Sequence, residues 1–560
     1  MVWTHPVAVP VNLNGPADRA FTPPPSDFTE RAILDLLSQV AAPSPDTIAV
    51  VGTNERLTYA ELLTTIGRIA NYVAGVVPAG EAIATVLPNS PTGFAAMLGC
   101  VVAGRVCIIL DPAHPPRRNA VILGDAQPAA VLLSNDFARS PATEIPSRIP
   151  RLTLEAALGQ SDGESWASPT KFDPDAPALV HYTSGSTGKP KGIVISTRVA
   201  LRRSLLYLEA WHFTGADRFL GSMQPSTNAG FCSSFAALCG GARLLVHSLA
   251  GEGMGTLFSL AQTEGLTLMD ASPSVVRLLF SQQGAKSAFS RLRVLRSAGE
   301  PVLRADIANW REVLPQGCHF AHAYGSTEAM NVAYWFVPPD YADHEPRLPA
   351  GYPLIDQEYA LIDASGANVP DGQSGELVLR SRHVACGEWR DGRCIPGRFW
   401  PDSSRPGWRI LRTGDVVRLG SDGLLRFVTR ADRQIKIHGV LVEPDEVESV
   451  LRGTPGVADA AVVARDHDGE TMLVAFVAAE AGRHHALSSL LRERLRAELP
   501  PSLRPTQIIM LDRMPYLPGG KIDLLRLTDA GSGPRWTQVL GMNTLRSVWQ
   551  AMSRWRRPSV

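Results

Sequence analysis

The sequence predicts an α/β protein with parallel sheets covered by helices, followed by a smaller β-rich region and a separate α+β unit. Before Gly351, short apolar runs that read as buried strands alternate with amphipathic helical stretches. After Gly351 the expected strands are short and alternating, with glycine-rich turns. The length of 560 residues also exceeds the ~100–200 residues of one typical domain. We therefore expect at least two domains.

Composition excludes several classes of protein. Hydrophobic residues make up 45% and charged residues 19% of the chain, which is ordinary for a globular protein and excludes wholesale disorder. Lys+Arg and Asp+Glu both number 54, so a net charge of zero argues against a dominant nucleic-acid surface. Seven scattered cysteines without a C-x-x-C pattern indicate free thiols in a reducing compartment. With no leader-like start and no run of 18 apolar residues, we expect a cytoplasmic enzyme without a membrane span.

The elements of the large N-terminal region follow in order. Residues 1–26 are proline-rich and predict a loosely held, irregular arm. Apolar spacing predicts helices over 28–41, 57–76 and 91–104. Apolar runs bounded by turn residues predict buried strands over 46–53, 81–90, 106–112, 129–135, 177–184, 242–248, 266–272 and 293–299. Because strands and helices alternate, parallel sheets are expected.

The later elements are shorter. Alternating strands are expected over 358–363, 375–381, 408–419, 424–430 and 434–442, and then a separate unit with helices over 443–454 and 485–499 and strands over 458–466, 471–479 and 505–511. We place the boundary at Ala431–Asp432. The predicted division is an irregular arm over 1–26, a large core over 27–431, a small domain over 432–527 and a basic amphipathic tail over 528–560. The tail is expected to pack as a helix, to begin a carrier domain, or to touch an acidic carrier or an anionic membrane.

The densest chemical signal is the run from Tyr182 to Gly192, YTSGSTGKPKG, which follows an apolar strand. A Gly/Ser/Thr-rich loop after a strand offers backbone N–H groups and hydroxyls that can wrap a phosphate chain. The run is not a Walker A loop, because Lys189 is followed by Pro190, which has no hydroxyl to hold Mg²⁺. The spacing therefore disfavours a P-loop kinase or ATPase.

This loop resembles the phosphate loop of the adenylate-forming enzymes, which include acyl-CoA synthetases, luciferases and the adenylation domains of non-ribosomal peptide synthetases. Further resemblances occur in the family's order: AYGSTEA, SGELVLR, LRTGDVVRL, RADRQIKIHG and PGGK. Together they cover roughly residues 30–525, and VCIILDPAHPPRR favours the peptide-synthetase branch. The resemblance implies a large N-terminal domain with a small β-rich subdomain and a small, mobile α+β C-terminal domain.

The resemblance also implies an activity. Such enzymes join a carboxylate to ATP, with Mg²⁺, to give an acyl adenylate and pyrophosphate. They then pass the acyl group to a thiol, here that of the phosphopantetheine of a separate carrier protein. Both reactants of the first step are anions, so catalysis must neutralise charge and align the attack.

Residue roles are implied position by position. The nucleotide-binding set is Thr183, Ser184, Gly185, Ser186, Thr187, Gly188, Lys189, Lys191, Gly299, Glu300, Pro301, Tyr324, Gly325, Ser326 and Asp415. The catalytic set is Thr327 at the α-phosphate, Glu328 on Mg²⁺, Arg430 near the ribose and phosphates, and Lys521 between the carboxylate and the α-phosphate. Asp432 would be the hinge, and Lys436 and Gly439 would line the thiol tunnel. Thr429 stands where the family usually has glycine.

The acyl pocket is implied by alignment on FAALCGGARL. Its expected lining is Asn228, Ala229, Cys232, Asp270, Arg296, Ala298, Ala323, Asn331 and Val332. Asn228 stands where the peptide-synthetase branch has an amine-binding aspartate, and an amide cannot pair with an ammonium as a carboxylate can. Either Asp270 and Arg296 pair with each other, or Asp270 takes a displaced amine and Arg296 a second carboxylate or polar group.

The predicted substrate is a small polar acid. A non-standard amino acid ranks first, an aryl or hydroxy acid second and a plain α-amino acid third. A free-standing acid–CoA ligase is the alternative within enzymes. A non-catalytic protein that kept the fold is the alternative outside them, and Glu328, Asp415, Arg430 and Lys521 argue against it.

Overall fold

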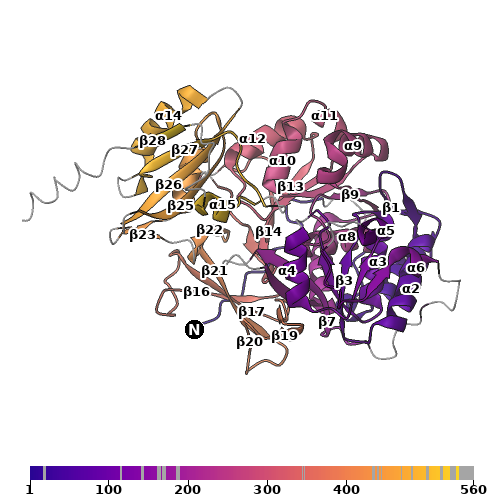
Figure 1. The fold of residues 1–560 in the computed structure, drawn as a ribbon. Coiled ribbons are helices and arrows are strands. Elements are labelled where there is room, and N and C mark those ends of the chain that lie inside the picture. The colour runs from indigo at the N-terminus through magenta and orange to yellow at the C-terminus, as the bar shows by residue number, and fades with distance from the viewer. Residues whose placement is uncertain are drawn as a thin grey trace, which may run out of the picture. The chain divides into compact units, whose positions relative to one another are not determined.

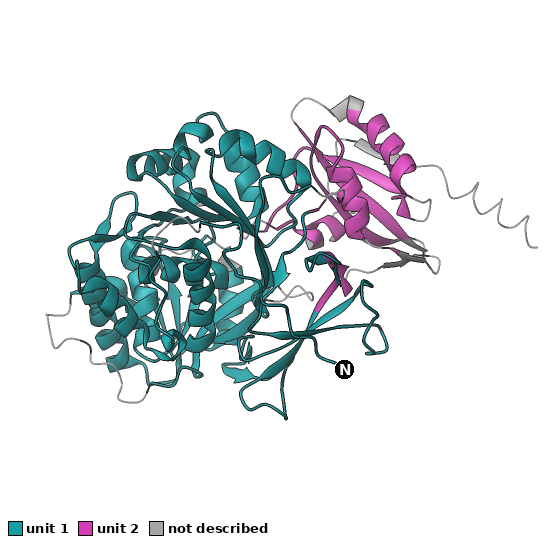
Figure 2. Ribbon diagram, turned by 180° about the vertical axis from the view of Figure 1, so that it is seen from behind, with its two compact units in different colours: residues 1–343, 348–413, 418–426 teal, residues 344–347, 414–417, 427–560 magenta. Residues whose placement is uncertain are grey.

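The structure, a computed structural model, describes residues 1–16, 21–113, 116–139, 144–159, 166, 172–184, 190–342, 345, 347–431, 435–437, 440–442, 444–467, 470–480, 484–499, 503–517, 521–529 and 538–541. The chain forms two compact units, drawn in different colours in Figure 2. The first contains Met1–Asp343, Leu348–Thr413 and Arg418–Arg426, and the second contains His344–Arg347, Gly414–Val417 and Phe427–Val560. Each is described by itself below.

The first sheet of the first unit is built on four neighbouring parallel pairings, as the sequence predicted. Its order is β19-β18-β8-β7-β4-β3-β5-β6, with β4 parallel to β3 and β7. The strands are β3 (Ala82–Val86), β4 (Val106–Leu110), β5 (Ala130–Leu133), β6 (Arg151–Thr153), β7 (Pro177–Ser184), β8 (Pro190–Ser196), β18 (Gly387–Arg390) and β19 (Arg393–Ile395). Every residue of β3, β4 and β5 is buried, because helices cover such sheets on both faces.

The second sheet has the order β15-β14-β13-β12-β11-β9-β10-β1-β2. Its strands are β1 (Ile48–Val51), β2 (Arg56–Thr58), β9 (Arg218–Gly221), β10 (Arg243–Leu245), β11 (Leu268–Ala271), β12 (Val294–Ala298), β13 (His319–Ser326), β14 (Met330–Val337) and β15 (Tyr352–Pro353). From β1 to β13 neighbouring strands run parallel. The carboxyl ends of these strands therefore meet at one edge.

Helices cover the two sheets (Figure 1). They are α1 (Ile33–Ala41), α2 (Tyr59–Val76), α3 (Pro91–Val102), α4 (Pro116–Ala126), α5 (Asn135–Arg139), α6 (Leu154–Leu158), α7 (Thr197–Trp211), α8 (Asn228–Cys239), α9 (Leu249–Glu264), α10 (Pro273–Phe280), α11 (Ala285–Ala288) and α12 (Arg304–Val313). A capping box between Thr58 and Glu61 starts α2. The helix expected over 28–41 is divided into a 3-10 turn, Phe28–Glu30, and α1, because Arg31 and Ala32 have extended backbones.

The β-rich region is a third sheet of order β16-β17-β21-β20, with β22 paired to β21. Its strands are β16 (Glu358–Ile362), β17 (Gly375–Ser381), β20 (Phe399–Pro401), β21 (Arg409–Leu419) and β22 (Leu425–Arg430). The irregular N-terminal arm forms a bridge to it, with Thr4 N–H donating to the Tyr359 carbonyl at 2.8 Å. Trp3 also packs against the small core of this sheet. The start of the arm is therefore held rather than loose.

The second unit is the predicted α+β fold. A four-stranded sheet of order β25-β26-β27-β28 carries helices α13 (Pro444–Arg452), α14 (His484–Glu498) and α15 (Leu524–Asp529). Its strands are β25 (Val457–His467), β26 (Glu470–Ala479), β27 (Gln507–Leu511) and β28 (Gln538–Gly541), and β23 (Ile435–Ile437) pairs with β24 (Val440–Val442). Strand β28 lies in the segment 528–560, which we expected to be a basic amphipathic tail. The rest of that tail beyond Gly541 lies outside the described residues.

Within the described ranges, none of the helices has the length and apolar character needed to cross a lipid bilayer.

Candidate active site

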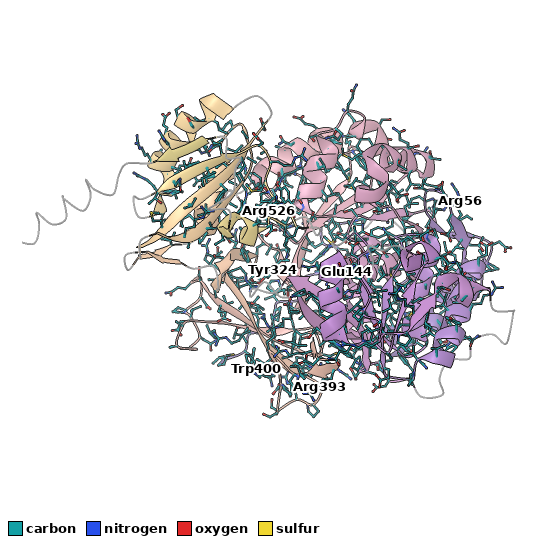
Figure 3. The ribbon with its side chains drawn as sticks, viewed as in Figure 1. Arg56, Glu144, Tyr324, Arg393, Trp400 and Arg526 are labelled. Atoms are coloured by element: carbon teal, nitrogen blue, oxygen red, sulfur yellow. The ribbon has the colours of Figure 1, made fainter. Side chains whose placement is uncertain are left out.

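Two of the motifs that are predicted to bind the nucleotide lie at the ends of neighbouring strands in the first unit. Gly299, Glu300 and Pro301 come directly after β12, and Tyr324 lies near the end of β13, where Figure 3 labels it. Strands β12 and β13 are parallel and pair Ala298 with Ala323. Gly299 and Tyr324, which follow these two residues, are therefore neighbours at the carboxyl ends of the strands. This is the arrangement expected if they form two sides of one binding site.

Glycines keep this site open. Gly299 has φ +89°, and no heavy atom lies within 4 Å of the place a Cβ would occupy. The side chain of Glu300 turns back into the protein, where it accepts hydrogen bonds from Ser274 N at 3.1 Å and Ser274 Oγ at 2.8 Å. Those bonds hold the loop after β12 against the first turn of α10.

Gly325 is required by close packing rather than by its φ angle. A Cβ there would collide with the carbonyl oxygen of Met330, where β13 and β14 approach each other. We expect Gly325→Ala to destabilise the protein by roughly 1–3 kcal/mol, because backbone must move. Thermal unfolding would measure this. Gly124→Ala is the matched control, since nothing lies within 4 Å of its Cβ position in α4 and alanine favours a helix. Equal melting temperatures for both variants would contradict the packing argument.

The phosphate loop is only partly described. Thr183 and Ser184 end β7, pairing with Lys191 and Pro190 at the start of β8. Residues 185–189, which include the predicted phosphate ligands Gly185, Ser186, Thr187, Gly188 and Lys189, lie outside the described residues. Lys191 Nζ forms an ion pair of 2.5 Å with Glu388 Oε1, a contact that the sequence did not predict.

The predicted magnesium ligand, Glu328, lies between β13 and β14. Its backbone oxygen accepts a hydrogen bond from Ala385 N at 3.0 Å, and Ser326 Oγ accepts one from Ala329 N at 3.0 Å, so the loop is held from two sides. Among the described residues no group of three or more His, Cys, Asp or Glu side chains could hold a metal alone. A single carboxylate suits Mg²⁺ when phosphate oxygens supply other ligands.

Three predicted residues belong to the second unit. Asp415 is 6% exposed, and its Oδ1 accepts a hydrogen bond of 2.8 Å from Arg430 Nη1. Lys521 is exposed in a turn that Leu517 N closes by donating to the Lys521 carbonyl at 2.7 Å. The predicted hinge, Asp432, and the tunnel residue Gly439 lie outside the described residues, and the side chain of Lys436 is likewise not described.

Asn228, the predicted selector of the acyl group, is held inside the protein. It is 1% exposed at the start of α8, and its Nδ2 donates to Met330 Sδ at 2.8 Å. Its Oδ1 accepts from Cys232 Sγ at 3.1 Å. Both ends of the amide are therefore occupied. Burial also raises the pKa of the Cys232 thiol to about 12, so this cysteine remains neutral.

Asp270 and Arg296 form an ion pair. Asp270 stands opposite Arg296 in the β11–β12 register, and Oδ1 accepts from Arg296 Nη1 at 2.6 Å, with both side chains almost fully buried. The guanidinium also lies 5.1 Å from the centre of the Tyr207 ring. Burial alone would lower the pKa of Arg296, but the Asp270 carboxylate raises it. The structure thus supports the first alternative, a structural pair, although Asp270 Oδ2 has no hydrogen-bond partner among the described residues.

The remaining acyl-pocket positions are mostly enclosed. Ala298, Ala323 and Val332 are buried, and Ala229 is half-buried. Asn331 is 7% exposed, and neither of its amide atoms has a hydrogen-bond partner in the described part of the chain.

Sequence reasoning missed the contribution of α7. This helix inserts Arg203 and Tyr207 next to the acyl-pocket positions, and Arg203 Nε donates to Tyr207 Oη at 3.1 Å. The available signal was an arginine followed four residues later by tyrosine in a helix with many apolar residues. Two buried histidines were also missed. His181 contacts the Ser226 carbonyl at 2.9 Å and His322 the Ser297 carbonyl at 3.1 Å.

These histidines predict an acid-sensitive fold. Burial lowers the pKa of His181 and of His322 to about 4, against 6.5 for a free imidazole. The unfolded chain therefore binds more protons between these values, and stability falls as the pH decreases from about 6.5 to about 4. Each histidine should cost roughly 2 kcal/mol at pH 5 relative to pH 7. Urea unfolding at both pH values would measure this, and a pH dependence unaltered in His322→Gln would contradict it.

The fold and site together define a nucleotide-using α/β enzyme that carries a separate α+β unit. Comparison with known families gives the particular class. The AMP-binding enzyme family matches residues 37–389, and the AMP-binding enzyme C-terminal domain matches residues 446–521. The chain belongs to the AMP-binding enzyme family and is an adenylate-forming ligase.

The chain is similar in sequence to peptide synthetases and in fold to a CoA ligase. The probable non-canonical nonribosomal peptide synthetase CymA of Salinispora arenicola is 34% identical over 490 residues, covering 86% of this chain and 6% of the relative. The isonitrile lipopeptide synthase of Streptomyces coeruleorubidus is 32% identical, covering 88% of this chain and 33% of the relative. The chain thus spans a third or less of the length of these relatives. The anthranilate CoA ligase AuaEII bound to anthranoyl-AMP shares the fold, with TM-score 0.76, 21% identity and coverage of 90% and 97%.

Proposed function

We propose that this enzyme activates a small polar carboxylic acid as an acyl adenylate, releases pyrophosphate, and transfers the acyl group to the phosphopantetheine thiol of a separate carrier protein. The observation that carries the proposal is the pairing of β12 with β13. This pairing brings Gly299–Pro301 beside Tyr324–Glu328. The models of the AMP-binding enzyme and of its C-terminal domain both match this chain. Similarity to peptide synthetases supports the carrier protein as acceptor.

Charge neutralisation is the central catalytic task. The carboxylate and the α-phosphate repel each other, so fixed donors and cations must be present as they approach. In the proposal Thr327 contacts the α-phosphate, and Glu328 holds Mg²⁺, which would supply additional positive charge at the phosphates. Asp415 would bind the ribose hydroxyls, and Arg430, which donates a hydrogen bond to Asp415, would contact the neighbouring phosphate.

The acyl pocket disfavours an amine-bearing acid. The amide of Asn228 is occupied by Met330 and Cys232, and the charge of Asp270 is neutralised by Arg296. An ammonium group would need an uncompensated carboxylate. We therefore rank acids without an α-amine, including aryl and hydroxy acids, above the non-standard amino acid that the sequence placed first.

Coenzyme A is the second candidate acceptor. The overall likeness to the anthranilate CoA ligase extends over 90% of this chain, so the fold is compatible with a free-standing acid–CoA ligase. The seven cysteines are free in the structure, which agrees with the cytoplasm that we propose as the location.

Two measurements test the proposal. Pyrophosphate release with ATP and Mg²⁺ would be followed across amino, aryl, hydroxy and dicarboxylic acids, and the responding acid would then be offered with CoA or with phosphopantetheinylated carrier proteins. We expect acid-dependent pyrophosphate release and acylation of a carrier. If only CoA is acylated, the acceptor in the proposed reaction is CoA rather than a carrier protein. Transfer of the γ-phosphoryl group without pyrophosphate release would overturn the assignment.

A further inference from the structure

A small cavity lies next to the acyl-pocket residues, within the first unit. Its volume is about 20 Å³, and its lining comes from α7, the start of β14, the segment after β15 and the end of β17. The polar lining residues include Arg202, Arg203, Asn331, Asp356, Gln357 and His383. A space of this size accepts one water-sized polar group. It suits the end of a substrate rather than a whole molecule.

One positive charge at the cavity is cancelled within the protein. Arg202 Nε lies 2.8 Å from Asp356 Oδ2, and His383 Nδ1 lies 3.3 Å from the same oxygen. Burial alone would raise the pKa of Asp356, but Arg202 and His383 lower it to about 2, so this carboxylate is ionised. Arg202 therefore has its counter-charge.

Arg203 does not have one in the described part of the chain. The residue is 7% exposed, its Nε donates to the neutral Tyr207 hydroxyl, and no carboxylate pairs with it among the described residues. An unpaired buried cation is costly, because its desolvation is not offset by a counter-charge. Asn331, on the same cavity, has both amide atoms buried without a hydrogen-bond partner among the described residues. A buried amide of this kind is costly as well, because it has lost its hydrogen bonds to water.

The cavity adjoins the acyl pocket. Met330 lines the cavity and accepts a hydrogen bond from Asn228, the first residue of α8. Cys232, one turn further along α8, is held beside α7, because the hydroxyl of Ser204, the residue after Arg203, donates to the Cys232 carbonyl at 3.0 Å. Arg203 and Asn331 on the cavity therefore lie close to Asn228 of the acyl pocket.

We propose that Arg203 and Asn331 form an anion-binding subsite, and that the acid activated by this enzyme carries a second carboxylate. This rests on the proposed function and names its substrate class, a dicarboxylic acid. One carboxylate is activated, while the other accepts hydrogen bonds from the Arg203 guanidinium and the Asn331 amide N–H groups. This role replaces the one first considered for Arg296, whose charge is used by Asp270. A dicarboxylic acid supplies the counter-charge that Arg203 lacks.

Binding and turnover together test the subsite. Calorimetry would compare malonate, succinate and glutarate with propionate, butyrate and valerate on the whole protein, and pyrophosphate release would be measured with the same acids. We expect the wild type to favour the dicarboxylates, and Arg203→Gln to reduce this preference about 10- to 100-fold in both assays. Asn331→Ala should reduce it less. Arg203→Lys, which keeps the charge, should restore part of it and guards against a folding defect.

Arg198→Gln is the matched control. Arg198 is a buried arginine of the same helix, but it is paired with Glu30 and Asp175 and does not line the cavity. The preference should persist in this variant. Equal binding of both acid series to the wild type, or a preference that survives in Arg203→Gln, would overturn the subsite. If pyrophosphate is released equally well by the wild type and by Arg203→Gln, the proposed function holds and the subsite is rejected. If dicarboxylate binding depends on Arg203 but no pyrophosphate is released, the subsite holds and the proposed function is rejected.

Discussion

Replacing Lys521 by alanine should reduce acyl-adenylate formation by about 10²- to 10³-fold while ATP binding persists. The proposed role of the ammonium is to lie between the carboxylate and the α-phosphate, where negative charge concentrates in the transition state. A contact made mainly in the transition state affects kcat more than KM. Because Lys521 is exposed in a turn of the second unit, its removal loses little packing and is expected to leave the protein folded.

Acid-dependent pyrophosphate release and nucleotide binding would be measured side by side for this variant. Lys286→Ala is a suitable control, since Lys286 is an exposed lysine of α11 in the first unit. It should behave like the wild type in both assays. Near-normal pyrophosphate release by Lys521→Ala would show that the reaction does not depend on this ammonium, and the assignment of Lys521 would be lost.

Much of the fold was predictable because its signals are local. The parallel sheets follow from apolar runs such as Ala82–Val86 and Val106–Leu110, whose residues are all buried. The long helix from Tyr59 was expected within two residues from its apolar spacing, and in the structure the Thr58–Glu61 capping box starts it. Strand β28, Gln538–Gly541, was missed because four residues at the edge of a sheet gain their structure from pairing with β27.

The candidate site divides in the same way. Positions such as Gly299, Tyr324 and Glu328 could be named as candidates from the sequence because they stand in contiguous motifs. The hydrogen bond from Asn228 to Met330 joins residues 102 positions apart, and no local sequence pattern predicts such a contact. Arg203 was missed for a related reason. A helical arginine usually reaches solvent, and only packing against β14 and α8 turns it into a buried charge.

The Asp270–Arg296 pair should carry the largest stability effect in the first unit. Arg296→Met leaves the Asp270 carboxylate buried without its partner, which typically costs about 3–5 kcal/mol. Asp270→Leu combined with Arg296→Met removes both charges, and replacing a whole buried pair by apolar groups is often close to neutral. Urea unfolding followed by tryptophan fluorescence would measure all three proteins, with Trp211 packed against Tyr207 as a nearby reporter.

The same variants decide what the pair does. If its role is structural, the loss in Arg296→Met should be largely recovered in the double variant, and Asp270→Asn should leave the ranking of substrates unchanged. If Asp270 instead anchors a substrate amine through its unpartnered Oδ2, Asp270→Asn should raise KM selectively for amine-bearing acids. The second result would restore the amino acid as substrate. The first would leave Arg203 as the pocket's uncompensated charge among the described residues, because the counter-charge of Arg296 lies within the protein.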